Sequence, residues 1–370
     1  MRASTATSDK SDDFVPIKRS LGKGRMTATW PYKEPKDWNW AESVLARMGI
    51  TPSTRPSGAP AKPPVYSNDT QVPVYPIWKM YLYATPKAVA PLLVDSGITY
   101  FTGYRIGKGW AAFVYMLCFS WYSRRTAIAF QRLMLNFGTL DARAPRDNIP
   151  DLDTGNMVLH FVASTLSRIP LGTLLLYQPN EPPLDLNTIL LLPVNVFIYA
   201  VVLDFYYYWY HRLMHEVDSL WKYHRKHHLT KHPVAIMAAY TDDEQGLFDI
   251  VIIPALALLT WQINFATWWV AMNFILYTEL AGHSGVRAYF QVIATWPLRY
   301  LGLELIVEDH DIHHRQGWRK SGNYGKQTRL WDAIFGTLMP RIECKSNNID
   351  WNDSMDESRS TLHSAIIDSN

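Results

Sequence analysis

The chain has polar ends and an apolar middle. Residues 1–75 are rich in Ser, Thr, Lys, Asp and Pro and show no hydrophobic period that could build a core, so we expect a disordered polar arm. Residues 341–370 are polar again and predict a flexible tail. Between these ends, apolar stretches of helical length predict an all-α membrane protein, with a membrane-associated helical region over residues 76–195.

The apolar stretches differ in how well they meet the length of about 20 residues that a spanning helix needs. Residues 188–203 carry no charge and are the strongest candidate. Residues 157–177 contain a proline and charged or titratable side chains, so that helix should be kinked or lie partly in the interface. Residues 250–277 predict a transmembrane helical hairpin. With the shorter stretch at 109–122, these segments predict about four spanning or half-spanning elements, hence a polytopic bundle.

Basic residues gather after the strongest span and after the hairpin, so both regions should face the cytosol. They are Arg212, Lys222, Arg225, Lys226 and Lys231, followed by Arg315, Arg319, Lys320, Lys326 and Arg329. The net charge of +3 gives no electrostatic footprint for nucleic acid. Cys118 and Cys344 are the two cysteines, which predicts no disulfide framework and suits a reducing compartment.

Nine of the twelve histidines fall in four short segments within the two basic regions or close to them. The segments are HRLMH with His211 and His215, HRKHH with His224, His227 and His228, GHSG with His283, and HDIHH with His310, His313 and His314. At about 100° per residue, positions three and four apart share one face of a helix, so each cluster aims its imidazoles in one direction. Such clusters are typical of metal sites.

Nine converging imidazoles exceed what one ion binds, so the pattern predicts two metal ions with positions left open for O2. Iron suits neutral histidine ligands and redox work, while zinc, copper or manganese are alternatives by ligand type alone. The alternative to a metal site is a set of unrelated buried hydrogen bonds, which would leave many costly polar groups to satisfy. We therefore expect a histidine-rich di-metal helical cap on the cytosolic side.

Several other polar residues are candidates for the same site. Asp204 lies seven residues before His211 and should share its helix face, where its carboxylate could orient a ligand imidazole. Glu279, four residues before His283, could place a carboxylate on the metal. In TDDEQG, Asp242 is a possible ligand and Glu244 a possible supporting carboxylate, with a solvated loop as the alternative for both.

The remaining candidates are judged by their surroundings in the sequence. His232 could be a tenth ligand, although we favour a turn before Pro233; His160 should be a packing or interface residue, and His363 should be solvated. Asp309 and Asp311 flank His310 and should face solvent.

The series HRLMH, HRKHH, GHSG, EDHDIHH, GNYG and LWDAIFGT resembles the fatty acid hydroxylase/sterol desaturase superfamily in order and spacing, over residues 196–340. The resemblance implies a di-iron domain there, bound by the nine clustered histidines, in a multi-pass protein of the endoplasmic reticulum membrane. It also implies electrons from NAD(P)H, delivered by an external cytochrome b5 or a reductase because the chain has no HPGG or GxGxxG motif. Asn323, Trp331 and Asp332 match the trailing motifs, and we interpret them as local packing.

These observations predict an O2-dependent enzyme that hydroxylates or desaturates an unactivated carbon of a lipid-like substrate, such as a sterol, a fatty acyl chain or a terpenoid. GHSG is followed by VRAYF, and Tyr240 is followed by TDDEQ where many members carry HPxE, so we favour a divergent enzyme of secondary metabolism. Aldehyde deformylation on the same site is one alternative. The alternative from another class is a metal-binding membrane protein without catalysis, such as a transporter.

Overall fold

The computed structural model describes residues 26–49 and 63–355, and helices dominate this part of the chain. The helices are α1 Trp40–Arg47, α2 Ile77–Thr102, α3 Lys108–Phe137, α4 Thr154–Leu176, α5 Leu186–Glu216, α6 Asp218–Trp221, α7 Asp243–Leu247, α8 Ile253–Thr260, α9 Phe265–Ser284, α10 Val307–Gln316 and α11 Leu330–Phe335. Two strands, β1 Val72–Val74 and β2 Ile349–Ser354, form a parallel pair, so the expectation of an all-α protein holds except for this small sheet.

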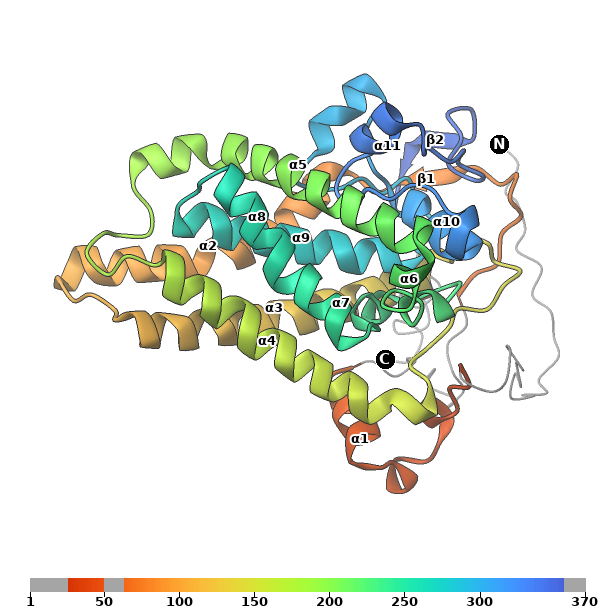
Figure 1. Ribbon diagram of the computed structural model, residues 1–370, viewed down its shortest axis with the longest axis horizontal. Helices are drawn as coiled ribbons and strands as arrows, with labels where there is room; N and C mark the ends of the chain where they lie inside the picture. The colour runs from red at the N-terminus through yellow and green to blue at the C-terminus, as the bar shows by residue number, and fades with distance from the viewer. Residues whose placement is uncertain (1–25, 50–62, 356–370) are drawn as a thin grey trace, which may run out of the picture.

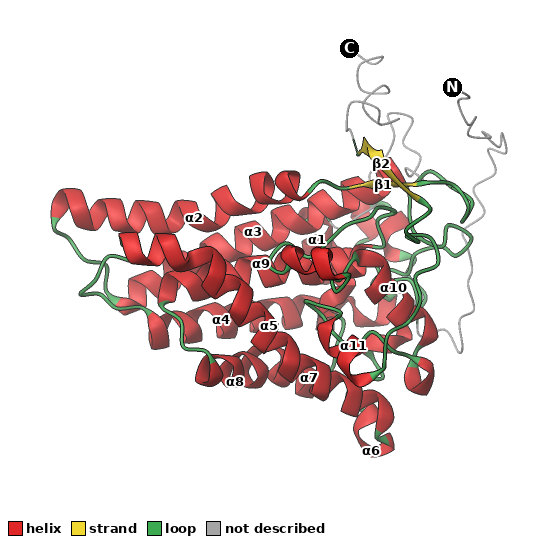
Figure 2. Ribbon diagram, turned by 90° about the horizontal axis from the view of Figure 1, so that it is seen from above, coloured by secondary structure: helices red, strands yellow, loops and turns green. Residues whose placement is uncertain are grey.

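The long helices α2, α3, α4, α5 and α9 form a bundle, and the short helices α6 and α10 lie at one of its ends (Figure 1). Helix α9 is the centre of this bundle, because it contacts α2, α3, α5 and α10 and is buried along nearly its whole length. Its sequence explains this, since an apolar helix without a polar face can be stable only when it is covered on all sides. In the view from above, the small sheet and the loops around α10 gather at the same end (Figure 2).

Two helices in the described residues are long and apolar enough to cross a membrane: Leu186–Glu216, which contains the strongest predicted span, and Asp151–Leu176. The predicted hairpin over 250–277 is present as two helical arms joined by a turn: α8, which continues from a π-helical turn at Phe248–Ile252, and α9, which is enclosed by protein. Neither arm is among the two candidate spans, so the crossing of the membrane by this hairpin stays a prediction. Apolarity alone could not distinguish a helix covered by protein from one covered by lipid.

The described parts of the two ends of the chain contain regular structure. The expected disordered arm, 1–75, contains α1, whose N-cap Asn39 forms a capping box with Glu42, and the buried Trp30, whose indole donates to the Ile149 carbonyl. Strand β1 also lies in this arm. In the expected flexible tail, 341–370, β2 pairs with β1. Residues 1–25, 50–62 and 356–370, including His363, lie outside the described residues.

The C-terminal segment is fixed to the bundle by buried charged groups. The Glu308 carboxylate on α10 accepts hydrogen bonds from the backbone amides of Ile342, Glu343 and Cys344 at 2.6–3.0 Å. The Glu343 carboxylate in turn accepts from the Arg287 guanidinium at 2.8 Å, with both side chains 2 % exposed. A buried charge is tolerable only when its partners are complete, so this network orders a segment that looks polar and mobile in sequence.

Gly172 permits the close approach of α4 to α9. A Cβ atom at this position would lie 2.1 Å from the Trp268 ring, whereas a Cβ at Gly97 on α2 would meet nothing within 4 Å. We expect Gly172→Val to lower the free energy of unfolding by about 1–3 kcal/mol or more, since the ring has to move. Gly97→Val is the matched control. Thermal unfolding in detergent measures both, and equal melting temperatures for the two variants would contradict this packing.

Candidate metal centre

The nine clustered histidines converge from four parts of the fold, and none is more than 4 % exposed. They form two groups, within each of which the potential ligand atoms lie within 4.8 Å of one another. The first group is His211, His215, His224, His228 and His313, and the second is His227, His283, His310 and His314. The division runs through the sequence clusters, because the adjacent His227 and His228 belong to different groups, as do His313 and His314.

The nitrogen atoms in each group are spaced as ligands of one ion would be. The His228 Nε2 atom lies 3.0, 3.0 and 3.1 Å from the Nε2 atoms of His215, His224 and His313. In the second group, His283 Nε2 lies 3.2 Å from His227 Nε2 and 3.1 Å from His310 Nε2. Imidazole–metal bonds of about 2.1 Å at a right angle separate two nitrogens by about 3.0 Å. Hydrogen bonds cannot explain all these contacts, since a nitrogen carries at most one hydrogen.

The hydrogen bonds made by the outer ring nitrogens determine which nitrogen of each imidazole carries the hydrogen and which presents a lone pair to its group. Six of the nine have an Nδ1 atom 2.7–3.2 Å from an oxygen atom that can only accept a hydrogen bond. The pairs are His211 with Tyr324 O, His224 with Gln245 Oε1, His227 with Tyr240 O, His283 with Glu279 O, His313 with Gly322 O and His314 with Thr230 O. Each Nδ1 therefore carries the hydrogen, and each Nε2 presents a lone pair to its group.

Electrostatics also favours neutral imidazoles. Burial lowers the pKa of His224, His227 and His228 well below the ordinary value, and the neighbouring imidazoles lower it further. Several lone pairs that face one another at about 3 Å repel, and a cation at the centre of each group would remove that repulsion. The donor set thus fits a metal ion in each group, with five and four protein nitrogens.

The loop at 322–328 orients two of these histidines and is itself held by two buried aspartates. Its carbonyl groups at Gly322 and Tyr324 are the acceptors for His313 and His211. Asp332 accepts from the amides of Tyr324 and Gly325, and Asp204 accepts from those of residues 326–328 at 2.7–3.0 Å. The expected hydrogen bond from an imidazole N–H to the Asp204 carboxylate is therefore not formed. Its carboxylate supports His211 indirectly, through the loop.

The segment TDDEQG contributes a different residue from those expected. Glu244 is exposed, whereas its neighbour Gln245 is buried and accepts from His224 through Oε1 at 3.0 Å. Successive side chains on helix α7 point about 100° apart, so Gln245 faces His224 while Glu244 faces solvent. Asp242 lies 3.5 Å from the Lys226 ammonium and belongs to neither histidine group.

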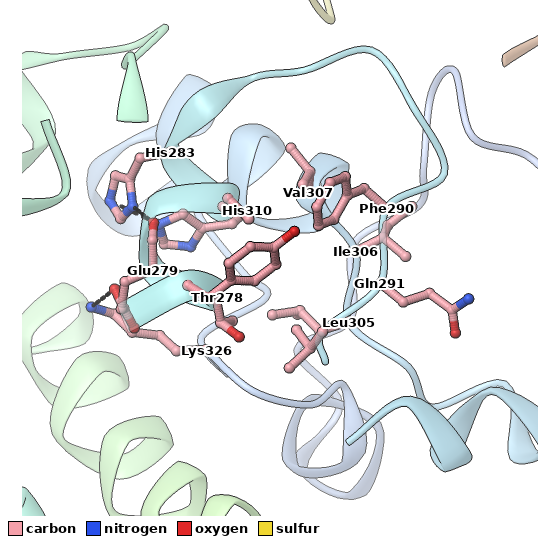
Figure 3. A pocket seen from close by; sticks show the side chains of 14 residues that line it. Thr278, Glu279, His283, Phe290, Gln291, Leu305, Ile306, Val307, His310 and Lys326 are labelled. Atoms are coloured by element: carbon pink, nitrogen blue, oxygen red, sulfur yellow. Dashed lines mark hydrogen bonds and ion pairs between the residues drawn. The ribbon is translucent and has the colours of Figure 1, made fainter. Parts of the chain in front are cut away.

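Glu279 and His232 also lie outside the two groups. The Glu279 carboxylate pairs with the Lys326 ammonium at 3.3 Å, beside His283 and His310 (Figure 3). Lys326 is buried, so it does not add to the exposed positive charge that we used to orient the chain. His232 lies 3.8 Å from the Asp141 carboxylate, and its backbone amide donates to Asp147. His160 is partly buried, with its Nε2 atom 3.1 Å from the Thr241 hydroxyl.

The expectation that Asp309 and Asp311 face solvent is wrong, because both are fully buried. Asp309 is paired with Arg341 at 2.8 Å, and Asp311 with Arg146 at 2.6 Å. These arginines come from segments remote in sequence, so helix periodicity could not reveal them. Their ion pairs hold α10 in place on both sides of its histidine face.

A cavity of about 390 Å³ lies between α1, α3, α4 and α9. Its wall is mostly apolar and includes Phe119, Phe161 and Leu276. Glu279 belongs both to this wall and to that of a smaller pocket lined by His283 and His310. The size and apolar lining are typical of sites for small apolar ligands, and the shared Glu279 puts the cavity next to the histidines.

These features define a helical, histidine-rich protein in which two groups of histidines that could each hold a metal ion lie beside an apolar cavity. The fatty acid hydroxylase family model matches residues 196–337, which hold all nine histidines. The chain belongs to the fatty acid hydroxylase/sterol desaturase superfamily. No solved structure matches it significantly.

Three relatives illustrate the range of this superfamily. Fatty acid hydroxylase vlmA of Lecanicillium sp is 41% identical over 256 residues, which cover 66% of this chain and 68% of the relative. Methylsterol monooxygenase erg25A of Aspergillus fumigatus is 28% identical over 49% of this chain and 59% of its own length. Very-long-chain aldehyde decarbonylase GL1-8 of Oryza sativa subsp. japonica is 31% identical over 39% of this chain and 51% of its own length.

The metal-free protein should lose stability as the pH falls. The buried histidines have a lower pKa in the folded state than the value of about 6.5 in an unfolded chain, so the unfolded state binds more protons below pH 6.5. Each unit of pH below 6.5 should cost about 1.4 kcal/mol for every histidine that stays neutral. Thermal unfolding between pH 8 and pH 5 measures this effect. The double variant His224→Gln/His227→Gln should respond less steeply, and a pH-independent melting temperature would contradict the buried neutral shell.

Gln245 offers a test of the support around the metal centre. Gln245→Leu removes the acceptor that fixes the His224 ring and should weaken metal binding about 10- to 100-fold, the usual cost of losing such a partner. Glu244→Gln, at the adjacent exposed position, is the matched control. Metal content after dialysis against a graded chelator measures both variants. Equal retention by the two would show that Gln245 does not orient His224.

Proposed function

We propose that this protein is an O2-dependent, histidine-ligated di-iron enzyme that hydroxylates an unactivated carbon of a lipid-like substrate. The observation that carries this proposal is the set of inward-facing histidine nitrogens, divided into two groups, beside an apolar cavity. The named activities of the relatives, a fatty acid hydroxylase and a methylsterol monooxygenase, support the oxidation of a lipid.

Two bound iron ions would supply the redox chemistry that activates O2. The chain's own residues hold and orient that chemistry. His211, His215, His224, His228 and His313 would hold one ion, and His227, His283, His310 and His314 the other. Backbone carbonyls fix the tautomers of five of these histidines and Gln245 fixes that of His224, so six ligand nitrogens are in place before metal arrives. The apolar cavity wall excludes water and holds the substrate next to the site.

The proposal includes a source of electrons and a place in the cell. Electrons would come from NAD(P)H through an external cytochrome b5 or a reductase, because neither a haem-binding nor a dinucleotide-binding motif is present in the sequence. The enzyme would sit in the endoplasmic reticulum membrane with α4 and α5 crossing it. Exposed basic residues near the histidines, such as Arg225 and Arg319, favour a cytosolic site.

Two alternatives use the same residues. Desaturation would differ from hydroxylation in that the substrate loses a second hydrogen instead of gaining a hydroxyl group. Aldehyde deformylation is suggested by the name of the rice relative. A non-catalytic metal transporter would need ligands along a path through the membrane. The nine histidines instead form two adjoining groups, three of their members lie on α10 at one end of the bundle, and this arrangement favours a fixed site.

An isotope experiment tests the proposed reaction. Membranes that contain the protein, its electron donor and NADH should incorporate one ¹⁸O atom from ¹⁸O₂ into a hydroxylated lipid. His228→Ala removes a nitrogen that faces three others and should lower the rate by about 100-fold or more. His232→Ala, outside both groups, is the control and should keep the wild-type rate. Unlabelled product, or full activity of His228→Ala, would contradict the proposal.

A further inference from the structure

The cavity beside the histidines is built by two different parts of the chain. Helices α5 and α9 contribute Tyr207, Leu276 and Glu279, which lie within the matched family region. The opposite walls come from α1, α3 and α4, all of which precede residue 196. The family motif therefore fixes the reacting end of the cavity, and the N-terminal part of the chain shapes the remainder.

Helix α1 supplies the cavity wall on the side of α4, whereas Glu279 beside the histidines belongs to α9. Val44 of this helix and Met48, its C-cap residue, are half-buried and line the cavity, while Ala41 and Leu45 belong to the hydrophobic core. The helix packs on α4 and lies at the edge of the bundle, beside the N-terminal end of that helix (Figure 1). The Arg124 guanidinium on α3 donates to the Arg47 carbonyl at 2.9 Å, which ties the C-terminal end of α1 to the cavity wall.

The two serine hydroxyls near α1 are already satisfied by the protein. The Ser120 and Ser123 hydroxyls line the cavity but donate to the Met116 and Phe119 carbonyls of their own helix, each at 2.7 Å. A ligand group that needed a hydrogen bond would find these hydroxyls occupied, so hydrocarbon fits beside them, and the Arg124 guanidinium at the rim is exposed to solvent. The charged pair of Glu279 and Lys326 lies at the other end, next to the histidines.

We propose that α1 is the element that determines substrate length, with Val44 and Met48 as the floor on which an apolar tail ends. The inference rests on the proposed function only in taking this cavity as the substrate site. It assigns to the substrate an extended hydrocarbon part that points away from the metals. Each methylene that fits above the floor adds apolar burial, and a methylene beyond it has no room.

Binding of straight-chain 1-alkanols tests this assignment without turnover. Iron-loaded protein in nanodiscs, kept free of O2, is titrated with alkanols of 10 to 20 carbons, and the chain length with the highest affinity is recorded. Val44→Trp raises the floor, so the optimum should move to shorter chains, with about fourfold lower affinity for each methylene that no longer fits. Met48→Ala lowers the floor and should move the optimum to longer chains.

The control variant is Ser43→Trp, which adds the same bulk to α1 at a partly exposed position outside the cavity and should leave the optimum unchanged. An unshifted optimum in both cavity variants, or a uniform loss at every chain length, would overturn the assignment of α1. The proposed function would survive either result as long as the wild-type protein binds alkanols and incorporates ¹⁸O. Wild-type protein that binds no alkanol would overturn the cavity as the substrate site.

Discussion

The structure depends on one electrostatic constraint: nine buried, neutral imidazoles direct their acceptor nitrogens into two small groups. Lone pairs at about 3 Å repel each other, so the protein must force this arrangement until a cation relieves it. Hydrogen bonds from the Nδ1 atoms to oxygen acceptors outside the two groups hold the rings in this arrangement. Carbonyls such as Tyr324 O and Tyr240 O take the Nδ1 hydrogens and leave each Nε2 facing inward.

This requirement explains much of the surrounding fold. The carbonyls must be held rigidly, and the loop at 322–328 is fixed for this purpose by Asp204 from α5 and Asp332 from α11. Helix α10, which carries three of the histidines, is braced by ion pairs of Asp309 and Asp311 and by the hydrogen bonds of Glu308 to the C-terminal segment. Carboxylates that look solvated in sequence thus form a second layer that positions the histidines.

The sequence predicted that the nine histidines converge, because they recur at helical spacings and that pattern is visible locally. It predicted their supports poorly. Gln245 differs from the expected Glu244 by one helical position, and Arg341, which pairs with Asp309, and Arg146, which pairs with Asp311, come from remote segments. The same reason applies to the fold: α5 was foreseen from its own apolarity, but the enclosure of α9 and the pairing of β1 with β2 depend on contacts between distant parts of the chain.

The central claim is that the histidine groups hold two iron ions. Metal analysis of the purified protein, combined with Mössbauer spectroscopy of ⁵⁷Fe-enriched samples, tests it most directly. We expect about two irons per chain. We also expect two sites with different ligand numbers, five and four nitrogens, and the corresponding two quadrupole doublets in the reduced protein. One metal ion per chain, or full occupancy by zinc in protein that is active, would contradict the account.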